Sequence, residues 1–105
     1  MTWMKAANRG DISPGACLGV SVGGHELALF NVDGCIYATS NICTHQFAYL
    51  TDGYMEGEYI ECPLHQGRFN VTTGAAAGSP VDKSLRVFPI RVEGESVMVN
   101  TGDVG

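Results

Sequence analysis

Two pairs of potential metal ligands stand out in the sequence, and each pair contains one cysteine and one histidine. The first pair is Cys43 and His45, and the second is Cys62 and His65. Two thiolates and two imidazoles can bind a tetrahedral zinc ion. They can also bind a [2Fe–2S] cluster in which two histidines replace two cysteines on one iron. The sequence therefore predicts a metal centre.

The way the ligand types are distributed favours the cluster over zinc. Zinc sites of this composition usually pair cysteine with cysteine and histidine with histidine. Here each pair mixes the two types, so both cysteines can reach one iron while both histidines reach the other. A Cys-x-His pair is a short chelate for a single tetrahedral ion, though not an impossible one. A zinc-binding structural module is therefore the alternative.

Short strands must position these ligands. Turn-forming pairs occur at 23–24, 33–34, 56–57 and 93–94, and each contains glycine. Strand-like segments rich in β-branched and aromatic residues lie at 18–22, 26–32, 35–39, 59–62, 67–71, 85–92 and 96–100. No long window has a helical stripe, so we predict an all-β domain, with irregular segments at 41–53 and 62–80. Pro89 predicts an edge position or a bulge.

Composition excludes several classes of protein. The net charge is −5, from 11 acidic and 6 basic residues, which argues against nucleic acid as a partner. No apolar run approaches the ~18 residues of a membrane helix, and the N-terminus lacks a secretory signal. We expect one soluble, cytoplasmic domain over residues 1–105, with reduced cysteines. Of these, Cys17 and Cys35 have no histidine close behind them and are predicted to be buried thiols.

The ligand pattern resembles that of the Rieske iron–sulfur family. The stretches at 36–45, 52–57 and 61–70 are similar to the ferredoxin components of bacterial aromatic-ring-hydroxylating dioxygenases, and the similarity runs from about Trp3 to Asn100. This resemblance implies a fold of antiparallel sheets, a sandwich or partial barrel, with a small loop subdomain. The ligand loops would lie at about 43–48 and 62–67. A loop at 78–80 would shield the cluster.

The resemblance also divides the roles of the site residues. It implies that Cys43 and Cys62 bind the inner iron, and that His45 and His65 bind the outer iron at an exposed tip. The residues expected to shield the cluster or form the docking tip are Gln46, Phe47, Leu64, Gln66 and Pro80. Phe47 and its neighbour Tyr49 could either seal the cluster from water or present apolar surface to a partner.

Two differences from high-potential members of the family imply a low reduction potential. Those proteins have a disulfide across the cluster, and the corresponding residues here are Ala48 and Leu64. They also place a serine and a tyrosine hydroxyl on the sulfurs, where this chain has Gly67 and Phe69. We therefore expect a potential near the lower end of the Rieske range, at about −150 mV.

The implied function is one-electron transfer. Electrons would come from an NAD(P)H-dependent flavoprotein ferredoxin reductase and pass to a terminal Rieske non-haem iron aromatic-ring dioxygenase. The chain lacks a Gly-x-Gly-x-x-Gly nucleotide fingerprint and has no room for an oxygenase domain, so we expect a component, and a monomer, rather than an enzyme. The main alternative is a Rieske ferredoxin that serves a different oxidoreductase.

Overall fold

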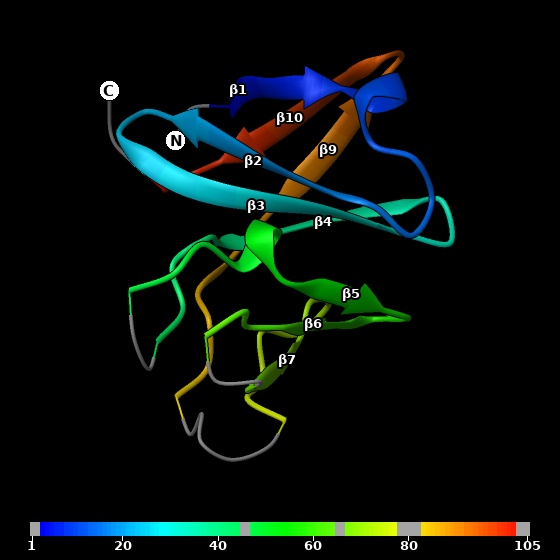
Figure 1. Ribbon diagram of the computed structural model, residues 1–105. Helices are drawn as coiled ribbons and strands as arrows, with labels where there is room; N and C mark the ends of the chain where they lie inside the picture. Colours follow the sequence, from blue (N-terminus) through cyan, green and yellow to red (C-terminus); the bar gives the residue numbers. More distant parts are fainter. Residues whose placement is uncertain (1–2, 45–46, 65–66, 78–82, 103–105) are drawn as a thin grey trace.

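The computed structural model describes residues 3–44, 47–64, 67–77 and 83–102, and these form three antiparallel sheets (Figure 1). The first sheet has the order β1 (Trp3–Asn8), β10 (Ser96–Asn100), β9 (Ile90–Glu93). The second has the order β2 (Cys17–Val22), β3 (His25–Val32), β4 (Cys35–Ser40), β8 (Val87–Phe88). The third is β5 (Tyr54–Glu56), β6 (Tyr59–Glu61), β7 (Arg68–Asn70). Two short 3-10 helices, η1 (Arg9–Asp11) and η2 (Leu50–Asp52), complete the described elements.

The predicted turns all connect neighbouring antiparallel strands. They join β2 to β3, β3 to β4, β5 to β6 and β9 to β10. At the β3–β4 turn both Asp33 and Gly34 have positive φ values, of 52° and 92°. A two-residue hairpin turn of this hand needs positive φ at both central positions, which explains the Asp-Gly pair. The all-β prediction is confirmed.

The strand predicted at 85–92 is divided in the structure. β8 pairs with β4 at the edge of the second sheet, and β9 pairs with β10 at the edge of the first. Pro89 lies between them and has no N–H for either ladder, while its carbonyl accepts a hydrogen bond from the Asn100 N–H. The edge position predicted for Pro89 is confirmed. Strands β1 and β5 were not predicted, because neither segment has a clear apolar alternation.

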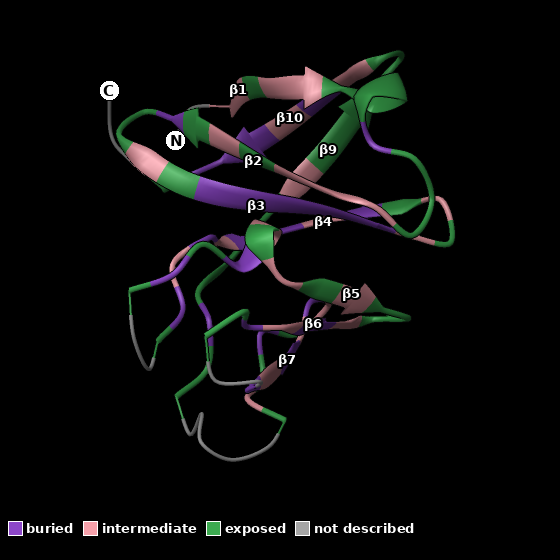
Figure 2. Cartoon of the chain, viewed as in Figure 1, coloured by how far each residue is buried: buried purple, intermediate pink, exposed green. Residues whose placement is uncertain are grey.

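Strand β3 is buried on both faces and separates two hydrophobic clusters. Figure 2 shows it coloured as buried over most of its length. Because side chains alternate across a strand, Leu27 and Leu29 pack between the first and second sheets, whereas Ala28 and Phe30 face the other way. The second cluster, here called the site core, consists of Ala28, Phe30, Cys43, Ala48, Leu50, Ile60, Cys62, Phe69, Val71 and Leu85.

The site core joins the third sheet and the predicted ligand loops to the rest of the fold. On β6 and β7, Ile60 and Phe69 are paired across the ladder and are fully buried in this core. β3 thus lies between the first sheet and the part of the chain that carries the ligand loops (Figure 1). Within the described residues no helix is long and apolar enough to cross a membrane.

Candidate metal centre

The two predicted ligand loops are closed by the same hydrogen bond. The Cys43 N–H donates to the carbonyl of Ala48 over 3.0 Å, and the Cys62 N–H donates to the carbonyl of Gly67 over 2.8 Å. Each bond closes a loop from a cysteine to the fifth residue after it. The two bonds therefore join the ends of the segments predicted as ligand loops, residues 43–48 and 62–67. The second members of the pairs, His45 and His65, lie outside the described residues.

Both cysteines point into the site core. Cys62 is fully buried and Cys43 is 4% exposed, and none of the four cysteines of the chain, all of them described, is in a disulfide. By contrast, Leu64 and Thr44, which also belong to the loops, are exposed. Two thiols reaching one apolar core from two loops form a donor set that fits the inner iron of a [2Fe–2S] cluster. An apolar setting also restricts solvent around such a site.

The second ligand loop is the tip of a β-hairpin. β6 ends at Glu61, directly before Cys62, and β7 begins at Arg68, directly after Gly67. Glu61 and Arg68 are paired across the ladder, so backbone hydrogen bonds set the separation of the loop ends. The predicted strands at 59–62 and 67–71 each end one residue inside their predicted bounds, and this places Cys62 and Gly67 in the loop.

The first ligand loop is flanked by a single antiparallel bridge, between Ile42 and Tyr49, and also depends on Asn41. This residue is buried, its N–H donates to the Glu26 carbonyl, and its carbonyl accepts from the Leu50 N–H over 2.8 Å. Its side chain accepts from the Thr51 N–H over 3.0 Å and donates to the Thr51 hydroxyl over 3.1 Å. Asn41 therefore ties the chain before Cys43 to the 3-10 helix η2 that follows the loop. The sequence pattern does not predict this role, although asparagine after a strand often bonds nearby backbone.

Gly53 connects the supports of the two loops. It follows η2, and a Cβ atom at this position would lie 1.9 Å from the carbonyl oxygen of Glu61, the residue before Cys62. Real Cβ atoms do not approach backbone this closely, so only glycine fits without a shift of β6. This role of Gly53 was not predicted either. A lone glycine before a strand is the available signal of close backbone approach.

Two of the predicted tip residues are exposed apolar side chains. Phe47 is 72% exposed and Leu64 is 60% exposed, one in each ligand loop. The ring of Tyr49 lies edge-on to that of Phe47, with centroids 5.5 Å apart. Of the two alternatives for Phe47, presentation to a partner fits this exposure better than sealing. The other predicted tip residues, Gln46, Gln66 and Pro80, and the rest of the predicted shielding loop lie outside the described residues.

The remaining two cysteines differ from the predicted ligands. Cys17 on β2 is half-buried against the site core, and burial, followed by the negative charge of Asp52, raises the pKa of its thiol. Cys35 is exposed, so the prediction that it is buried was wrong. It is the first residue of β4, directly after the β3–β4 turn, where the strand has left both cores.

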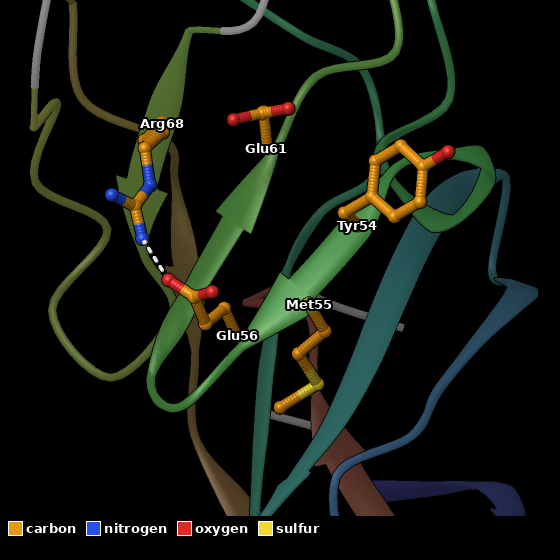
Figure 3. Close-up of a pocket in the computed structure, with 5 residues that line it drawn as sticks. All are labelled: Tyr54, Met55, Glu56, Glu61 and Arg68. Carbon is orange, nitrogen blue, oxygen red and sulfur yellow. Dashed lines mark hydrogen bonds and ion pairs between the residues drawn. The ribbon is translucent and has the colours of Figure 1, made fainter.

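A hollow beside the second ligand loop does not contain either predicted thiol ligand. It has a volume of about 340 Å³ and lies on the third sheet, lined by Tyr54, Met55, Glu56, Glu61 and Arg68 (Figure 3). The Arg68 guanidinium is 3.2 Å from the Glu56 carboxylate and lies over the ring of Tyr59. Glu56 is therefore in an exposed ion pair with Arg68, and such pairs contribute little to stability.

Comparison with known proteins agrees with this geometry. The sequence profile described as "Rieske [2Fe-2S] domain" matches residues 2–89. The ferredoxin component of a naphthalene 1,2-dioxygenase system from Pseudomonas putida is 51% identical over 98 residues, which cover 93% of this chain and 94% of that protein.

Solved structures give the same result. A ferredoxin from Sphingomonas yanoikuyae B1 superimposes with a TM-score of 0.91 at 35% identity, covering 95% of this chain and 99% of that one. The second structure is a complex of reduced oxygenase and oxidized ferredoxin in carbazole 1,9a-dioxygenase. One chain of it superimposes with a TM-score of 0.87 at 42% identity, covering 92% of this chain and 91% of its own length.

Proposed function

The chain belongs to the Rieske [2Fe–2S] domain family, and from this membership we propose that Cys43, His45, Cys62 and His65 hold its cluster. The observation that carries the assignment is the burial of Cys43 and Cys62 in one core, from two loops with the same closure. Cys17 and Cys35 do not compete for the role, since Cys35 is exposed and Cys17 lies on β2.

Within the family, the chain is a ferredoxin component of the kind found in multicomponent aromatic dioxygenase systems. It is an electron carrier and not the enzyme that oxidises the substrate. When bound, a Rieske cluster accepts and releases one electron at a time. Histidine ligation makes that electron easier to add than four thiolates would, because two thiolates bring less negative charge to the irons.

The protein's own contribution is to exclude water on one side and to expose the loops on the other. The site core surrounds the two thiols with Phe69, Ile60 and Leu85, all of them buried. On the outer side, Phe47 and Leu64 place exposed apolar surface on both ligand loops. We assign this exposed surface as the docking tip, because apolar side chains beside a redox centre favour close approach of a partner.

We propose two partners for this tip. The recipient is a terminal oxygenase, which is supported by the similarity to the ferredoxin crystallised with the oxygenase of carbazole 1,9a-dioxygenase. The donor is an NAD(P)H-dependent flavoprotein reductase, since a one-electron carrier cannot take hydride directly. A single tip that serves both partners requires the carrier to leave one before it binds the other.

The ligand assignment is tested with single cysteine variants. Cys43→Ser and Cys62→Ser are each expected to give protein without the visible absorption and the reduced-state EPR signal of a Rieske cluster. Cys35→Ser is the matched control, because it removes an exposed thiol of the same chain, and it should keep both signals. A colourless parent protein with bound zinc would contradict the cluster, and retention of the cluster in either ligand variant would contradict the assignment.

The partner assignment is tested by reconstitution. The parent protein is mixed with the reductase and oxygenase components of the Pseudomonas putida naphthalene system, NADH and naphthalene, and product is measured. We expect product formation that depends on the ferredoxin, and a lower rate with Phe47→Ser or Leu64→Ser. If turnover is supported only by components of an unrelated oxidoreductase, the alternative of a different partner system is correct.

A further inference from the structure

Thr44 makes a hydrogen bond that the ligand assignment does not explain. It lies between Cys43 and His45, its side chain is exposed, and its hydroxyl donates to the backbone carbonyl of Lys83 over 2.9 Å. These residues are 39 positions apart in the sequence. The bond therefore joins the first ligand loop to a distant part of the chain.

The segment that supplies the acceptor is itself held on two sides. Leu85 is buried in the site core, and its N–H donates to the Gly74 carbonyl over 2.7 Å. The carbonyl of Arg86 accepts from the Ser40 N–H over 2.9 Å. In Figure 1 this segment, in orange, passes close to the first ligand loop on its way to β9. The carbonyl of Lys83 thus lies two residues before a buried residue that is hydrogen-bonded to the rest of the fold.

The second ligand loop obtains the same restriction by a different means. The residue after Cys62 is Pro63, whose ring fixes φ near −65°. The residue after Cys43 is Thr44, which has no such covalent restriction. A side-chain hydrogen bond to a fixed acceptor limits both the rotamer and the backbone of the residue that makes it.

We propose that Thr44 is a positioning residue for the iron–sulfur cluster. Its hydroxyl holds the first ligand loop against residues 83–86 and so fixes the backbone between the two predicted ligands of that loop. The consequence is a longer lifetime of the bound cluster. This proposal rests on the assignment of Cys43 and His45 as ligands.

The test compares the cluster-loaded parent protein with three variants. Thr44→Val keeps the β-branched shape and removes the hydroxyl, and Thr44→Ser keeps the hydroxyl. Thr73→Val is the matched control, because the Thr73 hydroxyl accepts an exposed hydrogen bond from the Ala75 N–H and Thr73 belongs to neither ligand loop. The rate of loss of visible absorption in EDTA and the line widths of the reduced-state EPR spectrum are measured for each.

We expect Thr44→Val to lose the cluster about fivefold faster than the parent, which corresponds to one hydrogen bond of typical net strength. Its EPR lines should broaden, because the loop samples more than one geometry. Thr44→Ser should restore both values, and Thr73→Val should match the parent.

Three results would overturn the role of Thr44. These are an unchanged lifetime and EPR spectrum in Thr44→Val, a Thr44→Ser variant that behaves like Thr44→Val, and an equal effect of Thr73→Val. All three require a parent with a Rieske EPR signal, so they leave the proposed function intact. A parent without that signal would instead overturn the proposed function, and the role of Thr44 with it.

Discussion

The two ligand loops share one backbone closure but have different supports. The second loop lies at the end of the β6–β7 hairpin, so its ends are held by paired strands. The first loop has β4 on one side and the 3-10 helix η2 on the other, and the side chain of Asn41 joins them. A strand ladder is made of many backbone bonds that do not depend on side-chain identity. The first loop has one bridge pair, Ile42 and Tyr49, in place of paired strands, so it depends more on a few particular side chains.

This difference indicates where substitutions should lower the stability of the loops most. Around the second loop, exposed side chains such as Arg68 can change with little effect, because the ladder remains. Around the first loop, single polar groups are buried or fixed, and the loss of one leaves its partner unsatisfied. The two cysteines therefore lie in loops that differ in how well they tolerate substitution, and the first loop tolerates it less well.

The largest expected effect comes from Gly53, which couples the two supports. In Gly53→Ala the new Cβ would lie 1.9 Å from the Glu61 carbonyl oxygen, so β6 must move. We expect a loss of about 3 kcal/mol in the free energy of unfolding, at the upper end for overpacking, together with loss of cluster. Urea unfolding followed by circular dichroism, with iron analysis, measures both.

Gly10→Ala is the control for this substitution. The nearest atom to its added Cβ is 3.7 Å away, which is ordinary contact, so a change below about 0.5 kcal/mol is expected. Equal stability losses in the two variants would show that the Gly53 contact does not constrain the loops.

The second effect compares one asparagine from each side of the site. Asn41→Ala leaves the Thr51 N–H without its side-chain acceptor in a buried setting, and we expect a loss of about 2 kcal/mol. Asn70, the last residue of β7, accepts from the Thr72 N–H with its side chain but is only half-buried, so water can replace it. Asn70→Ala should cost about 1 kcal/mol or less. Thermal unfolding and the rate of cluster loss in EDTA test this order.

A reversed order would break the comparison between the loops. If Asn70→Ala destabilised the protein as much as Asn41→Ala, the first loop would not depend more on side chains than the second. The cluster-loss rate is the sharper readout, because only Asn41 holds the chain directly before a predicted ligand.

The sequence was sufficient to predict the second loop because its supports are local. The segments at 59–62 and 67–71 have strand composition and flank Cys62 and His65, so a hairpin follows from the pattern. The turn pairs and the all-β class were predicted for the same reason. The four-ligand pattern was recognisable because it depends on residue type and spacing and not on the fold.

The supports of the first loop could not be predicted, because they are contacts of individual residues and not of segments with strand composition. The hydrogen bond from Thr44 to Lys83 and the approach of Gly53 to Glu61 leave no periodic signal. The exposure of Cys35 was missed for a related reason. Its strand is correctly predicted, but which end of a strand leaves the core is decided by tertiary packing.

The smallest expected effect is electronic, and it concerns the second loop alone. High-potential members of the family have a serine hydroxyl at the position that the resemblance aligns with Gly67. Gly67 is buried at the end of the second ligand loop, directly before β7, so a serine there would add a hydroxyl to the loop that begins at Cys62. A hydroxyl donor near the cluster stabilises the more negative, reduced state, and about 1 kcal/mol of stabilisation corresponds to about 40 mV for one electron.

We therefore expect the reduction potential of Gly67→Ser to lie about 40 mV above that of the parent. The potential of the parent itself should be about −150 mV. Ala48→Ser, at the equivalent closing position of the first loop, is the comparison, and it should move the potential less. A parent potential above about +100 mV would contradict the low-potential assignment. An equal shift of the potential in both serine variants would show that the two loops affect the reduction potential equally. The loops would then differ only in how the rest of the fold supports them.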